Sequence, residues 1–167
     1  LDAHQQLRVK HPGLVFILAP RRIERIEEVV KLLKKKNISF ALRSSLGLEH
    51  EKNVILLDTM GELAQVYSLG QVAFVGKSLI KPGGGHSLLE PLRQGLPVIH
   101  GPFIENICHV ADKAQELGPA LTAKNSEDIK EKVQILLESK SLRQELQKRA
   151  HFFITQQQGA SRKMAQI

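Results

Sequence analysis

The stretch KPGGGHSLLEPLRQGLPVIHGP, residues 81–102, decides the fold that we predict for this chain. Three glycines at 83–85 run directly into a helical pattern that ends at Gly95, and a short apolar run follows at 97–99. Glycine has no Cβ, so backbone N–H groups in such a loop approach a ligand closely, and a helix N-terminus favours an anion. The stretch therefore predicts a phosphate- or nucleotide-binding edge of an α/β sheet.

Strands and helices are predicted to alternate along the chain. Residues 14–19 are apolar throughout, which is typical of a strand buried on both faces in a parallel sheet, and residues 21–36 have the spacing of an amphipathic helix. Further strands are predicted at 38–42, 54–57, 72–75 and 120–122, and further helices at 58–68, 105–117, 126–139 and 141–158. This order predicts a Rossmann-like, doubly wound parallel sheet. We expect one domain over residues 1–167, since the sequence has no linker and no internal repeat.

The composition is that of a soluble globular protein with a surplus of positive charge. The chain is 42% hydrophobic and has a formal charge of +7, which suits phosphates, sugar acids or an anionic membrane face. Trp is absent and Tyr67 is the one tyrosine, so we expect no nucleic-acid partner that requires aromatic stacking. Cys108 is the one cysteine and the histidines lack ligand spacing, so we expect neither a disulfide nor a metal site.

Polar features follow four of the predicted strands. In an open α/β sheet, ligands bind at the carboxyl ends of the strands, so these features predict one binding edge. Arg21 offers a fork of donors to a phosphate or carboxylate. As a cation in the first turn of the predicted helix, it would also oppose the helix dipole unless an anion were bound. The features are Pro20-Arg21-Arg22, residues 58–62, residues 76–87 and residues 100–106.

Spacing excludes two generic nucleotide motifs. Gly76-Lys77-Ser78 is similar to the end of a P-loop, but Gly70 stands one residue too early. The glycines at 83–85 do not form GxGxxG and follow a late strand, which disfavours a dinucleotide dehydrogenase. Ser87 and Glu90 have the spacing of a capping box, and two interpretations stay open. They cap the helix, or Glu90 accepts from a ribose diol while neighbouring N–H groups hold a phosphate.

Five segments resemble the C-terminal half of a Kdo transferase. This family moves 3-deoxy-D-manno-octulosonic acid (Kdo) from its CMP donor to a lipid A precursor. The resemblance runs over nearly the whole chain and implies the GT-B fold, in which two Rossmann-like domains face each other and this chain is the second, CMP-sugar-binding one. The segments are AP-R at 19–21, DTMGEL at 58–63, FVGKSL at 74–79, GGGHSLLEP at 83–91 and PVIHGPFIEN at 97–106.

The resemblance also implies a binding site, partners and a location. It places no catalytic residue, cofactor or metal in this chain. The catalytic base, the acceptor surface and the membrane anchor would belong to an N-terminal domain, so we expect an isolated C-terminal domain to be inactive. The location implied is the cytoplasmic face of the bacterial inner membrane, with peripheral contact to its anionic surface. The residues implied in CMP-Kdo binding are Pro20, Arg21, Gly61, Glu62, Leu63, Ser87, Leu88, Leu89 and Glu90.

The chain departs from the family pattern at several positions. The family usually has Asn at Ser87, Pro at Leu88, a second Gly at Lys77, and His-Pro at Arg22-Ile23. Ser87 still offers one hydrogen bond, so binding by the start of the helix is retained. The chain also opens in helical sequence without an initiator Met, and we expect a fragment of a longer protein.

Two other functions stay open on the residues alone. One is another GT-B member, such as a nucleotide-sugar epimerase or a different glycosyltransferase. The other is a non-enzymatic nucleotide-binding module. Stronger binding of UDP than of CMP favours the first, and a lack of transfer activity with CMP-Kdo and the lipid A precursor lipid IVA favours the second.

Overall fold

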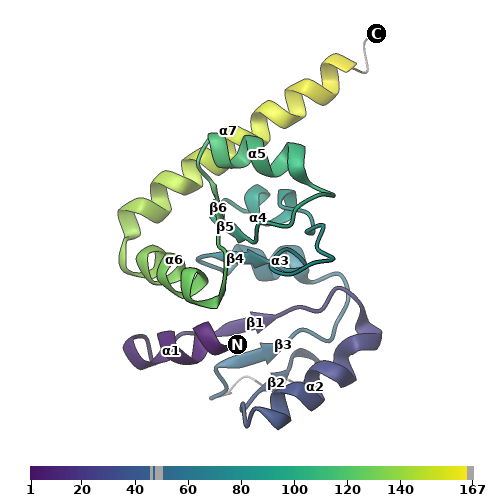
Figure 1. Cartoon of the computed structure of the whole chain (residues 1–167), viewed down its shortest axis with the longest axis vertical. Coiled ribbons are helices and arrows are strands. Elements are labelled where there is room, and N and C mark those ends of the chain that lie inside the picture. Colours follow the sequence, from purple (N-terminus) through teal and green to yellow (C-terminus); the bar gives the residue numbers. More distant parts are fainter. Residues whose placement is uncertain (46, 48–50, 165–167) are drawn as a thin grey trace. The chain divides into compact units, whose positions relative to one another are not determined.

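The structure is a computed structural model that describes residues 1–45, 47 and 51–164 (Figure 1). The chain divides into two compact units, Leu1–Leu63 and Ala64–Ile167. Each unit contains a three-stranded parallel sheet within its described residues. Parallel strands are what the sequence predicts, whereas the single domain over residues 1–167 stays a prediction.

The first unit, Leu1–Leu63, has the strand order β1-β3-β2. Both β1 and β2 run parallel to β3, and Leu18 and Leu42 lie opposite Leu56 from its two sides. Residues that follow these strands therefore share the carboxyl edge of the sheet. The elements are α1 (Asp2–Lys10), β1 (Phe16–Leu18), η1 (Ile23–Arg25), α2 (Ile26–Lys35), β2 (Ala41–Leu42), η2 (Arg43–Ser45) and β3 (Val54–Leu56).

The core of the first unit lies between α2 and β3. Leu33 of α2 is fully buried and clusters with Val54 and Leu56 of β3, and burial of one such leucine contributes about 2 kcal/mol. β1 is only half-buried, so the prediction of a strand buried on both faces at 14–19 is wrong. The reason is that β3 pairs on both sides, whereas β1 pairs with β3 alone among the described strands. β2 likewise covers only the last two residues of the strand predicted at 38–42.

The helix predicted from residue 21 begins five residues later. α2 starts at Ile26 after the 3-10 turn η1, and Arg21 lies in a bend before that turn. Glu27 and Glu28 stand in the first turn of α2 and lysines in its last turn, so the helix places its charges where its dipole favours them. Because Arg21 is outside the helix, the predicted conflict between its charge and the helix dipole is wrong.

The second unit, Ala64–Ile167, has the strand order β4-β5-β6. Each neighbouring pair is parallel, and His100 at the end of β5 lies opposite Val75 and Thr122. The helix that precedes β4 begins at Leu63, the last residue of the first unit. The elements are α3 (Leu63–Ser68), β4 (Ala73–Val75), α4 (Leu89–Arg93), β5 (Val98–His100), α5 (Cys108–Glu116), β6 (Ala120–Thr122), α6 (Ser126–Glu138) and α7 (Lys140–Met164).

Helices cover both faces of the second sheet, as expected for a doubly wound arrangement. All three residues of β5 are buried, and Val98 and Ile99 belong to two different hydrophobic clusters. Val98 packs with Leu92 of α4 and Phe153 of α7, whereas Ile99 packs with Leu136 of α6 and also meets residues of α7. A central strand buried on both faces is what the apolar run at 97–99 predicts.

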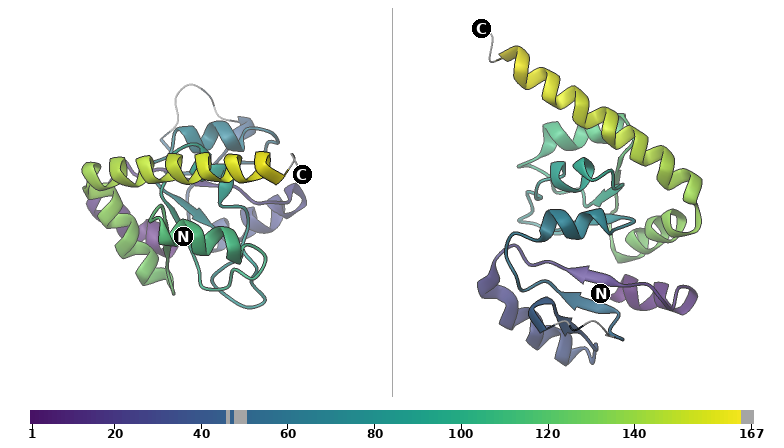
Figure 2. Two further views of the ribbon diagram at one scale, coloured as in Figure 1. Left: turned by 90° about the horizontal axis from the view of Figure 1, so that it is seen from above. Right: turned by 180° about the vertical axis from the view of Figure 1, so that it is seen from behind.

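The helices α7 and α4 differ from their predicted bounds. α7 runs as one long helix through residue 159, where its predicted end lies, to Met164 (Figure 2). A single glycine costs a helix only about 1 kcal/mol relative to alanine, and no proline follows it here. α4 is shorter than predicted and begins at Leu89. Within the described residues, no helix has the length and apolar composition needed to span a membrane.

Candidate functional site

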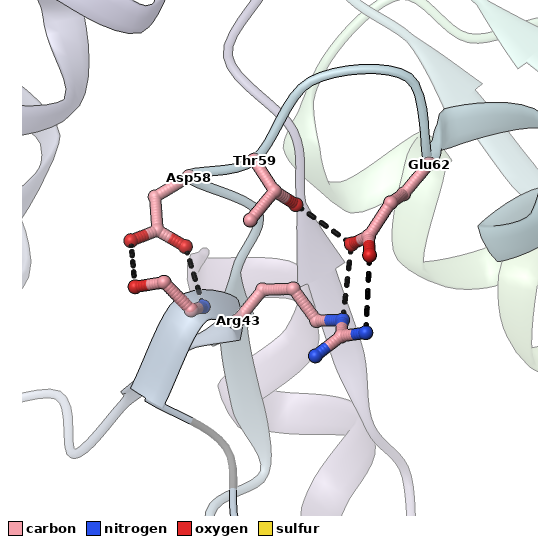
Figure 3. A network of polar contacts seen from close by, with 5 residues as sticks. Arg43, Asp58, Thr59 and Glu62 are labelled. Carbon is pink, nitrogen blue, oxygen red and sulfur yellow. Dashed lines mark hydrogen bonds and ion pairs between the residues drawn. The ribbon is translucent and has the colours of Figure 1, made fainter.

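The connection that follows β3 is a loop held by hydrogen bonds (Figure 3). Residues 58–62 were predicted to start a helix, but α3 begins only at Leu63, and Gly61 has a φ of 81°, which favours glycine. The Asp58 carboxylate accepts from the backbone N–H of Ser44 at 2.8 Å and from its hydroxyl at 2.5 Å. These two bonds fasten the loop after β3 to the turn after β2.

Glu62 makes the second attachment in this network (Figure 3). Arg43 reaches both carboxylate oxygens of Glu62, with Nε 3.0 Å from Oε2 and Nη2 3.1 Å from Oε1. The Thr59 hydroxyl donates to Oε2 at 2.7 Å. A forked arginine–carboxylate pair fixes geometry as well as charge. The Glu62 side chain therefore holds the shape of its own loop, which leaves the backbone at 61–63 to contact a ligand.

The hydrogen bonds at Asp58 also set its ionisation. Partial burial acts to raise the pKa of Asp58, but the hydrogen bonds from the Ser44 side chain and backbone outweigh it, so the pKa lies below its ordinary value. The carboxylate is therefore charged at neutral pH and keeps both bonds to Ser44.

Pro20 and Arg21 follow β1 at the same edge of the first sheet. The parallel ladder of β1 and β3 continues past the strands, since the N–H of Leu57 donates to the carbonyl of Leu18 at 2.9 Å. Pro20 is half-buried and Arg21 is exposed. The first unit thus brings two predicted groups, Pro20-Arg21 and the loop at 61–63, to one edge.

The glycine loop of the second unit packs against the connection that follows β5. The N–H of Gly84 donates to the carbonyl of Phe103 at 3.1 Å, and the N–H of Gly85 donates to the carbonyl of Lys77 at 2.8 Å. A Cβ at Gly83 would lie 2.3 Å from the Cβ of Phe103, and one at Gly84 would lie 2.3 Å from the amide nitrogen of Asn106. These glycines are required by close packing, and the expectation that their amides reach a phosphate is wrong for Gly84 and Gly85.

Of the two interpretations left open for Ser87 and Glu90, the capping box is absent from the described structure. The residue before α4 is Leu88, whose side chain makes no capping hydrogen bond. The Ser87 hydroxyl instead accepts from the N–H of Leu89 at 3.3 Å, two residues on. Among the described residues, the N–H groups of Ser87 and Leu88 have no hydrogen-bond acceptor.

The four predicted residues at 87–90 present different groups. Ser87 and Glu90 are exposed, Leu89 is half-buried, and Leu88 is fully buried in the hydrophobic core of the second unit. Leu88 therefore offers a ligand its backbone alone. Burial, together with the nearby charge of Glu90, raises the pKa of Tyr67. Glu90 is an exposed acidic residue in the first turn of α4.

Ser78 and His100 lie in two of the polar segments that follow predicted strands, but the sequence did not indicate that they are buried. The Ser78 hydroxyl donates to the carbonyl of Val75 at 2.7 Å and accepts from the N–H of Gly101 at 2.8 Å, which joins the ends of β4 and β5. Nδ1 of His100 lies 2.7 Å from the carbonyl of Gly101, and Nε2 lies 3.1 Å from the amide nitrogen of Gln115. With Nδ1 as donor and Nε2 as acceptor, the ring satisfies both contacts. Their pairing depends on folded neighbours, so no local pattern marks them.

Metal binding has no candidate in the part of the chain that the structure describes. No three His, Cys, Asp or Glu side chains there lie close enough to share an ion. The predicted residues instead offer an arginine, backbone amides and one exposed carboxylate, which are groups that bind phosphates and hydroxyls.

Residues 34–151 match the family model of glycosyl transferases group 1. The chain belongs to this family. Within it, the predicted resemblance to Kdo transferases is confirmed. The chain is 37% identical to the 3-deoxy-D-manno-octulosonic acid transferase of Haemophilus influenzae, over 100% of the chain and 39% of that protein. It is 33% identical to the transferase of the same name from Aquifex aeolicus, over 84% of the chain and 38% of that protein.

A solved structure gives the same result for this group 1 glycosyl transferase domain. The C-terminal CMP-Kdo binding domain of WaaA from Acinetobacter baumannii superposes with a TM-score of 0.86 at 32% identity, over 92% of this chain and 80% of that one. The predicted Rossmann-like α/β fold of the C-terminal half of a GT-B glycosyltransferase is thereby confirmed. The chain spans about two fifths of the length of the two transferases, at 39% and 38%.

Proposed function

We propose that this chain is the donor-binding domain of a Kdo transferase that moves Kdo from CMP-Kdo to a lipid A precursor in lipopolysaccharide synthesis. The observation that carries the proposal is the similarity, over 92% of the chain, to a domain that binds CMP-Kdo. The names of the Haemophilus and Aquifex relatives support transfer of the same sugar acid.

The phosphate of the donor is bound by Arg21 and by the backbone at the start of α4. Arg21 is an exposed cation at the carboxyl edge of its sheet, and the N–H groups of Ser87 and Leu88 lack acceptors among the described residues. As CMP departs, negative charge develops on its phosphate. Donors placed where this charge develops stabilise the transition state more than the ground state.

The nucleoside is bound by Glu90 and by the loop after β3. An ionised carboxylate only accepts hydrogen bonds, so Glu90 suits the two hydroxyls of a ribose. The backbone of Gly61, Glu62 and Leu63 contacts the cytosine, because the Glu62 side chain is occupied by Arg43 and Thr59. Backbone N–H and C=O groups in a fixed loop can form hydrogen bonds with the edge of a base, and these groups carry no net charge.

The remaining parts of the reaction belong to the rest of the protein. The base that activates the acceptor hydroxyl, the surface for the lipid A precursor and the membrane anchor are carried by an N-terminal domain, so the isolated donor domain does not transfer Kdo. The complete protein works at the cytoplasmic face of the inner membrane. The formal charge of +7 supports peripheral contact of this domain with an anionic membrane surface.

A transfer assay on the complete protein tests the proposal. We expect Kdo transfer from CMP-Kdo to lipid IVA, and a loss of about 100-fold in kcat/KM for Arg21→Gln, which is typical for removal of a donor that stabilises developing charge. Arg22→Gln is the matched control, because it removes a neighbouring exposed arginine, and we expect less than about a threefold change for this surface charge. No transfer by the wild-type protein, or an equal loss in both variants, would argue against the proposal.

A further inference from the structure

A pocket in the second unit lies at the amino edge of its sheet. It has a volume of about 290 Å³ and is formed by the connections at 68–71 and 94–97 and by the first two turns of α7. The two connections lead into β4 and β5, whereas residues 87–90 lie after β4. The pocket is therefore at the opposite edge of the sheet from the residues proposed to bind CMP.

The walls of this pocket are held together by a backbone bond and by close packing. The N–H of Ala73 donates to the carbonyl of Pro97 at 3.0 Å, which joins the two connections. A Cβ at Gly95 would lie 2.9 Å from Cγ of Gln147 on α7, and one at Gly70 would lie 2.8 Å from a methyl carbon of Leu96. The pocket is thus a fixed feature of the fold, as most ligand sites are before their ligand binds.

Two positive charges in the lining have no counter-ion in the described part of the chain. Nη1 of Arg143 donates to the carbonyls of Leu136 and Leu137, at 2.7 Å for Leu137, and these bonds to the end of α6 fix the guanidinium. Its Nε and Nη2 have no acceptor among the described residues, and neither has the ammonium of Lys140. No described Asp or Glu lines the pocket. An anion would therefore complete it.

The lining favours a phosphate ester over a simple carboxylate. A phosphate monoester carries a charge of about −1.5 to −2 at neutral pH, which two cations match. Adjacent N–H groups of a guanidinium form a fork that suits phosphate oxygens. Four glutamines line the same pocket, and their amides both donate and accept, which suits hydroxyl groups. A volume of about 290 Å³ is near the lower limit for ligand pockets, so the ligand is small.

We propose that this pocket binds the phosphate of a small, hydroxyl-bearing phosphate ester. Arg143 and Lys140 pair with the phosphate oxygens, and the glutamines bind the hydroxyls. The inference goes beyond the proposed function, because it assigns a second anion site to the edge of the sheet that the donor does not occupy. Soluble sugar phosphates and the headgroups of acidic lipids share this chemistry.

A titration of the isotopically labelled chain with glycerol phosphate, followed by NMR, tests the assignment. We expect amide resonances at 68–71, 94–96 and Lys140 to shift, and glycerol alone to leave them unchanged. Lys140→Gln should weaken glycerol phosphate binding at these resonances about fivefold, the size expected for one solvent-exposed ion pair, and Lys140→Arg should restore most of the loss. Lys148→Gln, which removes an exposed lysine from the same helix outside the pocket, is the control and should change nothing.

Lys140→Gln is the decisive variant because its ammonium has no partner among the described residues, so its loss leaves the fold intact. Arg143→Gln should weaken glycerol phosphate further, but it also removes two bonds to α6. A denaturant unfolding curve for each variant separates loss of binding from loss of stability. CMP binding at 87–90 should be the same in Lys140→Gln as in wild type, because that site lies at the other edge of the sheet.

A vesicle arm identifies the source of the phosphate. Cosedimentation with vesicles of equal parts phosphatidylcholine and phosphatidate, compared with phosphatidylcholine alone, measures lipid binding. Vesicle binding that Lys140→Gln weakens and Lys148→Gln does not assigns the site to a lipid headgroup, whereas dependence on Lys140 for glycerol phosphate alone assigns it to a soluble ester. If neither probe depends on Lys140, or if Lys148→Gln weakens binding equally, the proposal is wrong. Shifts by glycerol phosphate that are confined to 87–90 would also overturn it.

Discussion

Lys77 is held in a backbone conformation that favours glycine. Its φ is 58°, and its carbonyl accepts the N–H of Gly85 at 2.8 Å, so the glycine loop depends on this geometry. A side chain in the left-handed region costs roughly 1–2 kcal/mol through contact between Cβ and the backbone. Glycine at this position would avoid this cost.

Replacement of Lys77 by glycine is predicted to stabilise the chain. We expect Lys77→Gly to raise the free energy of unfolding by about 1 kcal/mol, because removal of the Cβ relieves the strain. Denaturant unfolding measures the difference. Lys148→Gly, inside α7, is the matched control and should lower the same quantity by about 1 kcal/mol. A loss of stability in Lys77→Gly would show that the strain is absent.

Gly101 has the opposite requirement, since it has no space for a side chain. A Cβ at this position would lie 2.0 Å from the carbonyl oxygen of Ser78, which is backbone that cannot yield easily. Gly101→Ala is therefore expected to lower the free energy of unfolding by about 3 kcal/mol. Gly76→Ala is the control, because a Cβ there meets no atom within 4 Å. Equal stability of the two variants in denaturant unfolding would contradict the packing of the loops after β4 and β5.

At the scale of elements, regular segments are predictable from sequence and the site loops are only partly so. The periodicity of residues 105–117 and 126–139 predicts α5 and α6 closely, because an amphipathic pattern is local information. The S-x-x-E spacing at Ser87 is also local, but burial of Leu88 in the core shifts the start of α4 to Leu89. Here tertiary packing overrides a capping preference.

The loop after β3 could not be predicted because its stabilising partners are distant in sequence. Arg43 and Glu62 are 19 residues apart, and Ser44 and Asp58 are 14 apart. The DTMGEL segment marked the loop as functional. The local sequence, however, does not indicate whether the Glu62 side chain binds a ligand or pairs with Arg43. The long-range pairs decide this.

The Asp58 attachment is predicted to depend on pH. A lowered folded-state pKa contributes stability above the unfolded pKa, and this contribution is lost as pH falls through the folded value. Asp58→Asn should therefore be less stable than wild type at pH 7, with a difference that shrinks below about pH 4. Denaturant unfolding at both pH values measures this. Asp112→Asn, at an exposed site on α5, removes the same charge as a control. A difference that is constant with pH would contradict the role of the Ser44 bonds.

The Arg43 attachment is predicted to matter for nucleotide binding. Arg43→Ala frees Glu62 and loosens the loop at 61–63, so we expect the Kd for CMP to rise about fivefold, as for loss of one ion pair and its positioning effect. Arg43→Lys keeps the charge but not the forked guanidinium group. Its Kd for CMP should therefore lie between those of the wild type and of Arg43→Ala. Arg25→Ala, which breaks an exposed helical pair with Glu28, is the control and should leave the Kd unchanged. A Kd for CMP that is unaffected by Arg43→Ala would show that the loop does not contact the nucleotide.

At the scale of the whole molecule, the proposed function gives the chain the donor-binding part of a transfer reaction. Its similarity covers about two fifths of the Haemophilus and Aquifex enzymes, and the contacts proposed for this reaction are all to the donor. The proposed function therefore assigns donor binding to this chain and acceptor activation to another part of the protein. This division predicts that the domain binds CMP without any acceptor.

A titration of the isotopically labelled chain with CMP, followed by NMR, tests the central claim most directly. The account predicts that amide resonances of Arg21, Gly61, Leu63 and residues 87–90 shift at ligand concentrations on the order of millimolar, which allows for weak binding by one domain. UDP should bind more weakly than CMP, and amides of α6 (Ser126–Glu138) should not shift. An absence of shifts at these positions, or tighter binding of UDP than of CMP, would contradict the account.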